Sequence, residues 1–394
     1  MPPPGNPATL PPRSSVAGRA AWVAAAVVLA GWGACYGIAF HRNITGFFRI
    51  GDARPPPPAL AGRDMMIYPR QAGYDGQYFL ALALDPWLRQ PGTTASLDHP
   101  QYRCRRLLFP LLGRLAALGR PAAVPYALPL LNALAAVLLV WCAARYLERG
   151  GTSGWQALFL LGLLGVWEVL TLTTADLLAS LFLVATLYAL RSERPAAAAV
   201  TLALACLTRE VMVLVWLVLL VVSLPERRWR RLVWLLGAAA PAAAWNLYVL
   251  VCVPPGVGQL GERLFFQTPL AAVTETVARL AAGGWGAKNL FEIYVFGLMP
   301  AALIVLLAAV VAARRRPEAR LVGGYALLLA VMFCTAMPSF YCYYIDYNRV
   351  FLDVYVLLVL SLAFTPWRRL TQGVLGLASV AGAAYAVAYA AGMI

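Results

Sequence analysis

The sequence predicts an all-α membrane protein, a helical bundle that crosses the bilayer about 11 times. Hydrophobic residues make up 61% of the 394 residues and charged residues 12%, whereas a soluble domain carries about 25% charged residues. The apolar residues fall in runs of about 20, which is enough to cross a bilayer core of about 30 Å. These observations exclude a soluble globular protein and a disordered chain.

The basic excess follows the pattern of a membrane protein and not that of a nucleic-acid-binding protein. The net charge is +15, Lys288 is the only lysine, and the arginines stand in short clusters between the apolar runs. Clusters of this kind set the orientation of membrane helices, whereas binding to nucleic acid needs a basic face on the fold. We therefore expect the lipid bilayer as a partner and no nucleic acid.

The chain divides into a Pro-rich tail and one membrane domain. Residues 1–15 are expected to form a disordered cytoplasmic tail, and residues 16–394 a single polytopic domain. The first apolar run, 20–40, is too long for a signal-peptide core and is expected to stay as a helix. Further apolar runs lie at about 122–144, 155–172, 174–190, 229–252, 291–313, 319–337, 350–365 and 371–392.

Two segments are too short to cross the membrane and predict half-length helices. The run 195–224 is interrupted by Thr208, Arg209 and Glu210, which leaves two halves of about 14 residues each. We expect these halves to form a hairpin whose polar tip lies inside the bundle. Residues 105–119 are short and basic, and they predict a half-helix at one surface.

The short loops set the orientation. Five of them, RYLER (145–149), RSER (191–194), ERRWRR (226–231), RRRPEAR (314–320) and PWRR (366–369), together hold 14 arginines, whereas the alternate short loops hold only Arg209 and Arg349. By the positive-inside rule, the first group and the N-terminus are cytoplasmic. The long loops 41–104 and 253–290 then face the exterior.

The first exterior loop contains the segment of greatest chemical interest, Tyr74-Asp75-Gly76-Gln77, which leads into a short apolar stretch. Aromatic residues in that stretch suit a helix that lies in the membrane interface. The arrangement predicts a carboxylate at the depth of the lipid headgroups, where it can accept a proton from a sugar or lipid hydroxyl. The alternative is a structural Asp-Gly turn with aromatic anchors.

This segment, followed by Tyr102-Arg103-Cys104-Arg105-Arg106-Leu107-Leu108-Phe109-Pro110, resembles the first outer loop of GT-C glycosyltransferases. The nearest pattern is Trp-Asp-Gly-x-x-Tyr-x-x-Ile-Ala followed by Phe-Phe-Pro-Leu-x-Pro-Leu, found in the group related to the second mannosyltransferase of GPI-anchor synthesis. The resemblance implies a GT-C-like bundle, a polyprenyl-phosphate sugar as donor, and Asp75 as the catalytic residue, with Tyr74 and Gln77 at the substrate.

The sequence departs from this pattern at two places. Tyr74 stands where tryptophan is usual, and Arg105 and Arg106 replace aromatic residues of the second motif. The substrate of the related group therefore does not transfer to this chain. We expect a bacterial branch at the plasma membrane, with a glycan or lipid of the cell envelope as acceptor.

Further charged residues on the exterior side are candidates for substrate binding. Arg209, at the tip of the broken hairpin, is placed to bind the phosphate of a lipid carrier, and GT-C enzymes often carry such a residue at a similar position. Glu210 beside it joins the site or forms a local ion pair with it. Arg103, Arg105 and Arg106 form a basic cluster that either attracts an anionic carrier or anchors the half-helix to headgroups.

Three more candidates lie nearer the C-terminus or at a helix end. Arg349 is expected to hold a phosphate or a sugar, and Asp346 to orient a hydroxyl. Asp176 begins a helix, where the helix dipole alone accounts for an acid. The nearby Tyr341, Tyr343, Tyr344 and Tyr347 suit sugar stacking, but an interfacial aromatic belt is the interpretation we favour.

The sequence favours an inverting membrane glycosyltransferase with Asp75 as general base. It contains no Walker motif or Gly-rich nucleotide loop, so the activated donor supplies the energy of transfer. No cofactor or metal is indicated by these residues, and a divalent ion held by Asp75 and another outer carboxylate stays open. The alternative function is a transporter or flippase for a lipid-linked or anionic solute, which broken helices with charge inside the bundle also suit.

Overall fold

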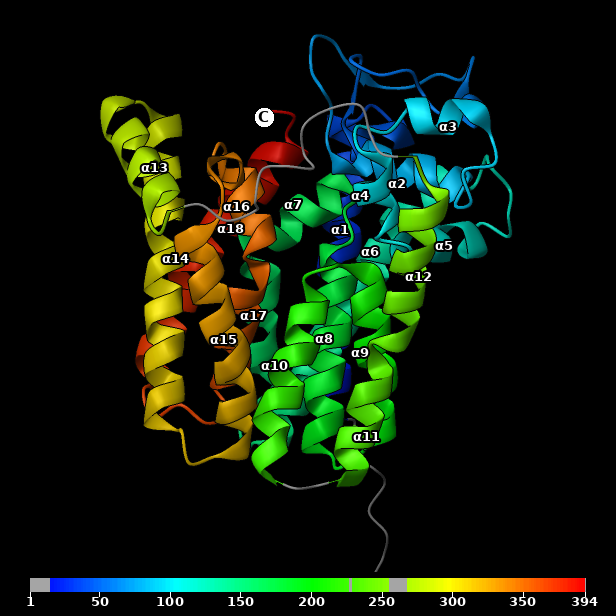
Figure 1. The fold of residues 1–394 in the computed structure, drawn as a ribbon. Coiled ribbons are helices and arrows are strands. Elements are labelled where there is room, and N and C mark those ends of the chain that lie inside the picture. The colour runs from blue at the N-terminus through cyan, green and yellow to red at the C-terminus, as the bar shows by residue number, and fades with distance from the viewer. Residues whose placement is uncertain (1–14, 227–228, 255–267, 394) are drawn as a thin grey trace, which may run out of the picture.

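A bundle of long and short helices, covered at one end by the first long loop, makes up the computed structural model (Figure 1). The structure describes residues 15–226, 229–254 and 268–393. Residues 1–14 of the expected tail and the segment 255–267 of the second long loop lie outside the described residues.

The helices vary widely in length. Those of the first half are α1 (Val16–Ala34), α2 (Asp75–Leu84), α3 (Pro91–Ala95), α4 (Pro100–Cys104), α5 (Leu108–Ala116), α6 (Val124–Arg149), α7 (Leu164–Leu172), α8 (Asp176–Arg191) and α9 (Pro195–Thr208). Those of the second half are α10 (Met212–Ser223), α11 (Trp229–Ala238), α12 (Ala240–Cys252), α13 (Ala271–Ala282), α14 (Ala287–Ala312), α15 (Pro317–Thr335), α16 (Tyr344–Val350), α17 (Leu352–Ser361) and α18 (Arg368–Ala390).

Shorter elements join these helices. A π-helical turn, Cys35–Ala39, extends α1, and 3₁₀ segments occupy Ile44–Phe48, Pro58–Leu60, Gly154–Gly162, Leu224–Glu226 and Pro338–Phe340. Two strands, β1 (Ile50–Gly51) and β2 (Ile67–Tyr68), pair in parallel, with Ile50 opposite Ile67. This pair, inside the first loop, is the one departure from an all-helical chain among the described residues.

Helix length and hydropathy make this a multi-pass membrane protein. Among the described residues, six helices are long and apolar enough to cross a membrane, or seven if a bent pair is counted as one span. About 11 spans were expected from the apolar runs. The difference arises in part because an apolar run expected to cross forms a helix too short to do so, as at 350–365, where α17 has 10 residues.

The bent pair consists of the 3₁₀ segment Gly154–Gly162 and α7, which meet at an angle of 61°. Leu163, between them, has an extended backbone, so the helix cannot continue through it. The indole Nε1 of Trp167 donates to the carbonyl oxygen of Leu161 at 2.7 Å, which satisfies a carbonyl group that the break sets free. The expected helix at 155–172 is therefore two helices with a corner.

The run 195–224 forms the two expected half-length helices. Arg209 has an extended backbone at the end of α9, and α10 starts three residues later. Both helices run between the interior of the bundle and the same end (Figure 1). Their shared tip therefore lies inside the protein, where Arg209 and Glu210 find partners on other elements.

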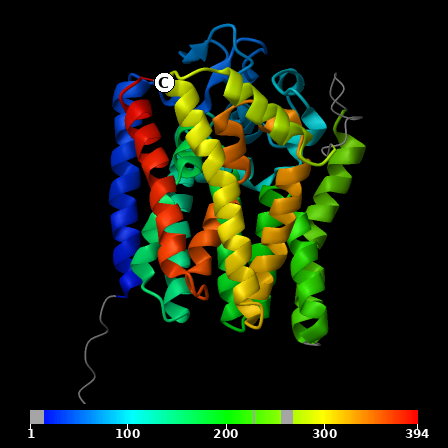
Figure 2. The same ribbon diagram turned by 90° about the vertical axis from the view of Figure 1, so that its left-hand side faces the viewer.

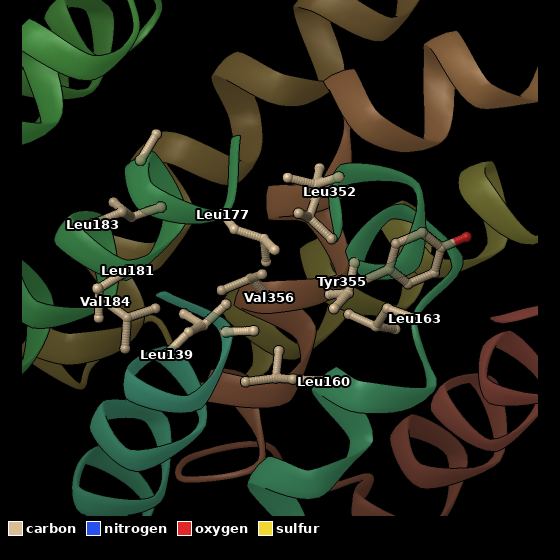
Figure 3. Close-up of a cluster of buried hydrophobic side chains, with 14 of the residues drawn as sticks. Leu139, Leu160, Leu163, Leu177, Leu181, Leu183, Val184, Leu352, Tyr355 and Val356 are labelled. Atoms are coloured by element: carbon tan, nitrogen blue, oxygen red, sulfur yellow. The ribbon is translucent and has the colours of Figure 1, made fainter. Parts of the chain in front are cut away.

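The core lies where α6, α8, α17 and the bent pair meet (Figure 3). Leu139 of α6, Leu177 of α8 and Val356 of α17 are at most 1% exposed. By contrast, large apolar side chains such as Trp22 and Val387 are exposed along the long helices. Lipid solvates such a surface, so the apolar exterior and the apolar core are both expected of a membrane protein.

The arginine-rich short loops gather at the end of the bundle opposite the first long loop (Figures 1 and 2). Arg191 Nη2 lies 3.6 Å from Glu318 Oε1, and Arg368 Nη2 donates to Thr152 Oγ1 at 3.2 Å. One end thus carries the basic clusters, and the other carries the loop with the candidate site.

The first long loop differs in one respect from the expectation for an interfacial helix. Every residue of α2 from Gly76 to Leu84 is buried, with Tyr78 6% and Phe79 3% exposed. The helix packs on α5 and α6, so its aromatic rings contact protein and do not serve as exposed membrane anchors. Its apolar composition reflects burial in the protein.

The close packing of α18 on the corner before α7 predicts a strong effect of one methyl group. A Cβ at Gly382 would lie 2.0 Å from the carbonyl oxygen of Gly162, whereas a Cβ at Gly376 on the same helix meets nothing within 4 Å. We expect Gly382→Ala to lower the unfolding free energy by about 1–3 kcal/mol through overpacking. Gly376→Ala is the matched control and should be neutral or slightly stabilising. Thermal unfolding in detergent measures both, and equal melting temperatures would contradict the packing described.

Candidate active site

Asp75 begins α2 at a turn that the surrounding loop holds rigidly. The amide nitrogen of Tyr74 donates to the carbonyl oxygen of Arg49 at 3.0 Å. A Cβ at Gly76 would lie 2.2 Å from the carbonyl oxygen of Leu172, so only glycine lets the start of α2 approach the end of α7 so closely. The Asp-Gly sequence thus places the carboxylate against the bundle.

The Gln77 side chain forms hydrogen bonds within the first long loop. Its Oε1 accepts from the amide of Gly51 at 3.1 Å, and its Nε2 donates to the carbonyl oxygen of Ala72 at 2.7 Å. Gln77 is buried and does not line the cavity described below. Both polar atoms of the side chain thus hold the turn, and the expected contact of Gln77 with substrate stays a prediction.

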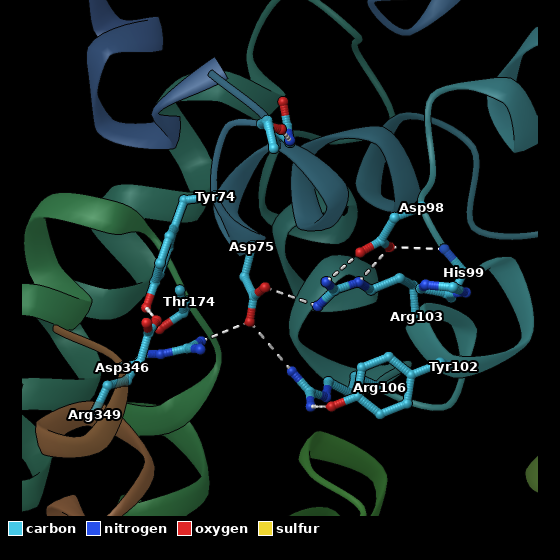
Figure 4. Close-up of polar contacts among 12 residues, drawn as sticks. Tyr74, Asp75, Asp98, His99, Tyr102, Arg103, Arg106, Thr174, Asp346 and Arg349 are labelled. Atoms are coloured by element: carbon cyan, nitrogen blue, oxygen red, sulfur yellow. Dashed lines mark hydrogen bonds and ion pairs between the residues drawn. The ribbon is translucent and has the colours of Figure 1, made fainter. Parts of the chain in front are cut away.

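The carboxylate of Asp75 is shared among arginines from two parts of the chain (Figure 4). Oδ1 accepts from Arg103 Nη1 at 2.8 Å, and Oδ2 accepts from Arg349 Nη1 at 2.7 Å, with Arg106 Nη1 3.6 Å away. Burial alone would raise the pKa of Asp75, but these guanidinium groups together hold it well below its ordinary value. The group is a carboxylate anion at neutral pH.

Arg103 is in turn held by Asp98. Its Nε and Nη2 donate to the two oxygens of Asp98 at 2.7 and 2.6 Å, and its guanidinium lies 4.4 Å from the ring centroid of Tyr78. These contacts fix both the place and the orientation of the guanidinium that faces Asp75. Arg103 was noted in the sequence only as part of a basic cluster.

The tip of the broken hairpin joins the same group of charges. Glu210 accepts two hydrogen bonds from Arg106, at 2.6 and 2.8 Å, and Arg106 also donates to the hydroxyl of Tyr102. Arg209 Nη1 lies 2.5 Å from Asp176 Oδ1. The two tip residues therefore pair with partners on other elements, and not with each other as a local ion pair.

Asp176 and Asp346 complete the group. Oδ2 of Asp176 accepts from Thr174 Oγ1 at 2.5 Å and lies 3.6 Å from Arg349 Nη1, so Arg349 stands between Asp176 and Asp75. Asp346 Oδ1 accepts from the hydroxyl of Tyr74 at 2.8 Å (Figure 4). Burial raises the pKa of Asp346 despite the Tyr74 hydrogen bond and Arg349, which lower it.

These charges border a cavity of about 370 Å³. Its polar lining residues are Asp75, Tyr102, Arg103, Arg105, Arg106, Arg209, Glu210, Asp346 and Arg349. Its apolar lining residues are Val211, Leu214, Met332, Ala336, Phe340, Val350 and Phe351. Of the ten residues expected at the site, only Tyr74, Gln77 and Asp176 do not line this cavity.

Two of the four tyrosines expected in an aromatic belt, Tyr341 before α16 and Tyr347 within it, lie inside the bundle. Tyr341 is 1% exposed and Tyr347 is fully buried. Both pack edge-on to Phe296, inside the bundle. The sequence contained no sign of this, because a run of tyrosines near a helix end has the same pattern in a belt and in a buried cluster.

The chemistry of this group favours an anionic ligand over a metal ion. Both oxygens of Asp75 already accept from guanidinium groups. In the parts of the chain that the structure describes, no group of three or more histidine, cysteine, aspartate or glutamate side chains is arranged to hold a metal ion.

Comparison with known proteins gives one result. No family model matches the sequence, and no curated protein matches it. A crystal structure of ArnT from Cupriavidus metallidurans in the apo state is similar to this chain, with a TM-score of 0.43 and 16% sequence identity, over 96% of this chain and 77% of that one. The function proposed below rests on the residues of the site.

The pairing of Arg103 with Asp98 predicts a pH-dependent loss of stability. Burial raises the pKa of Asp98, but its bonds with Arg103 outweigh this, and the pKa lies below its ordinary value. Because the pKa of Asp98 is lower in the folded state than in the unfolded state, the ion pair stabilises the fold fully at pH values above the unfolded-state pKa. This stabilisation is lost as the pH falls through the folded-state pKa. We expect Asp98→Asn to lower the unfolding free energy by about 1–3 kcal/mol at neutral pH.

Melting temperatures of the wild type and Asp98→Asn across pH check this. The difference in melting temperature between the two proteins should be largest at pH 7 and should shrink below about pH 4. Asp64→Asn, an exposed acid in the same loop, is the control and should change little. A difference that grows on acidification would contradict the ion pair.

Proposed function

We propose that this chain is a GT-C-type glycosyltransferase that moves a sugar from a polyprenyl phosphate to an acceptor on the extracytoplasmic side of a bacterial plasma membrane. The observation that carries the proposal is the carboxylate of Asp75 at the wall of a cavity rich in arginine. The motif around Asp75, which resembles the first loop of GT-C enzymes, points to the same residue. The arginine-rich loops at the opposite end support the orientation.

The cavity suits both parts of a lipid-phosphate donor. Five arginines but only three acidic residues line it, so its walls attract a phosphate. In the described part of the chain, the buried Nε atoms of Arg105, Arg209 and Arg349 have no hydrogen-bond partner, and a bound anion is one source of a missing acceptor. The apolar lining residues, which include Leu214 and Met332, suit the first isoprene units of the carrier.

The reaction in this site is a single displacement. The oxygen of the acceptor hydroxyl forms a bond to the anomeric carbon while the bond from that carbon to the phosphate oxygen breaks. The electron pair of the broken bond leaves with the phosphate, whose added charge is stabilised by Arg209 and Arg349. The hydroxyl proton passes to Asp75. Attack from the face opposite the phosphate inverts the anomeric configuration.

The arginines around Asp75 make its strength as a base depend on the donor. Asp75 is a weak base while Arg103 and Arg349 both donate to it, because they hold its pKa low. A phosphate in the cavity competes for Arg349 and Arg106. Each guanidinium that turns from Asp75 to the phosphate raises the pKa of Asp75 and so its strength as a base. The donor therefore binds before the base becomes active.

The main prediction concerns Asp75 itself. We expect Asp75→Asn to lower sugar transfer by about 10²–10⁴-fold, the range that general-base catalysis contributes. Purified protein, radiolabelled polyprenyl-phosphate sugars and an envelope acceptor fraction provide the assay, and analysis of the product gives the anomeric configuration. Asp64→Asn is the matched control and should keep full activity. Unchanged transfer by a folded Asp75→Asn variant would sink the assignment, and retention of configuration would sink the single displacement.

The alternative function, transport or flipping of a lipid-linked solute, is favoured by the charged hairpin tip inside the bundle. An assay of carrier translocation in liposomes, run beside the transfer assay, separates the two functions. For a transferase, Asp75→Asn loses product but leaves translocation unchanged. For a flippase, Arg209→Ala loses translocation in a protein that makes no product.

The role of Arg209 as a forked phosphate ligand gives a further prediction. Arg209→Lys keeps the charge opposite Asp176 but loses the planar fork. We expect kcat/KM for the lipid-phosphate donor to fall by about tenfold or more, mostly through KM. Arg120→Lys, at an exposed position, is the control. A wild-type KM in Arg209→Lys would show that Arg209 serves only to pair with Asp176.

A further inference from the structure

A second cavity, of about 440 Å³, lies on the other side of α16 from the candidate active site. Tyr343, Tyr344 and Ile345 line this second cavity, whereas Asp346, Arg349 and Val350 line the first. Helix α16 and Tyr343, the residue before it, therefore form part of the wall of both cavities. The proposed glycosyl transfer gives the second cavity no role.

The second cavity combines two cations with a set of aromatic rings. Arg49 and Lys288, the only lysine of the chain, line it together with Tyr343, Tyr344, Tyr385 and Tyr389. No acidic residue is present among the described residues that line it. A cavity with two positive charges and no negative charge favours an anion.

Contacts with aromatic rings hold both cations at the cavity. Lys288 Nζ lies 5.1 Å from the ring centroid of Tyr343, and the Arg49 guanidinium lies 5.3 Å from that of Tyr68. Cation–π contacts orient the cation without neutralising its charge. Each side chain therefore keeps its full positive charge for a ligand, whereas the arginines of the first cavity are largely paired with carboxylates.

The position of the cavity indicates where the anion comes from. Lys288 lies near the start of α14 and Tyr389 near the end of α18, two neighbouring candidate spans, and both lie at the end of the bundle that carries the first loop (Figure 2). Ala384, on the same cavity wall, is exposed on the outer face of α18. The cavity thus borders the lipid at the level where span helices end, which is the level of the headgroups.

We propose that this second cavity binds the phosphate of an anionic lipid headgroup, with Arg49 and Lys288 as its ligands and the tyrosines as its walls. The site is separate from the proposed donor site and does not depend on the glycosyltransferase function. Two guanidinium or ammonium groups at one phosphate make charge-assisted hydrogen bonds. The aromatic rings position the two cations beside the cavity.

The test measures lipid retention by the full chain. Wild-type protein in phosphatidylcholine nanodiscs that contain a minor fraction of phosphatidylglycerol is released for native mass spectrometry, and bound phosphatidylglycerol is counted. We expect the double variant Arg49→Gln/Lys288→Gln to lose about tenfold or more of the retained lipid. Arg89→Gln/Arg120→Gln removes the same charge from two exposed positions and should retain as much as the wild type.

Three controls make each outcome decisive. The melting temperature shows that the double variant is folded, and the single variant Lys288→Gln, at an exposed position, serves if it is not. Soluble glycerol 3-phosphate, added to protein in phosphatidylcholine alone, separates a free phosphate from a lipid. Equal retention of phosphatidylglycerol by the folded Arg49/Lys288 double variant and by the wild type overturns the proposed site. Tight binding of glycerol 3-phosphate without retention of phosphatidylglycerol overturns the assignment of the site to a lipid. Loss of sugar transfer in Asp75→Asn has no bearing on either result.

Discussion

The carboxylate of Asp75 links the long first loop to the helical bundle through Arg349. From it, charges of alternating sign run inward, from Asp75 to Arg349, then to Asp176, and then to Arg209. All four side chains are at most 14% exposed. Charges buried to this degree need neighbouring charges of opposite sign, because removing one leaves its neighbour uncompensated in a medium of low dielectric constant. The loop and the site therefore depend on the same contacts.

The short helices follow from the same need to bury charge. A continuous helix through 195–224 would present Arg209 and Glu210 on its surface, among apolar side chains. Instead, the extended backbone at Arg209 interrupts the helix and forms a tip between α9 and α10. At this tip, Arg209 pairs with Asp176 at the start of α8, and Glu210 pairs with Arg106 after α4. Arg106, Arg209 and Glu210 thus meet at the cavity, which apolar residues also line.

The sequence predicted the features that depend on local pattern. Long apolar runs predicted the membrane helices, and the interruption at Arg209 predicted the hairpin, because lipid tolerates neither a charge on a helix nor an unsatisfied backbone. The turn at Tyr74-Asp75-Gly76 and its resemblance to the first GT-C loop singled out Asp75, which the structure places beside Arg349 at the cavity. The apolar runs predicted too many spans, since an apolar run of ten residues buried on all sides, such as α17, has the same composition as part of a span.

The sequence did not predict features that depend on which elements meet. Arg103 is the nearest partner of Asp75 on Oδ1, yet 27 residues separate them, and a basic cluster looks the same whether it faces lipid or an acid. Gln77 was expected at the substrate, although its amide serves Gly51 and Ala72 of its own loop. In both cases, the partner belongs to a separate short segment of the same loop, and no pattern in the sequence indicates which of these segments meet.

The position of α16 between two cavities has a thermodynamic consequence. Asp346 and Arg349 face one cavity, and Tyr343 and Tyr344 line the other, so any ligand that displaces this seven-residue helix changes the shape of both. Binding in one cavity then alters the affinity of the other by some factor, and linkage requires that the same factor act in the reverse direction. The two cavities are energetically coupled to the extent that α16 moves as a rigid wall.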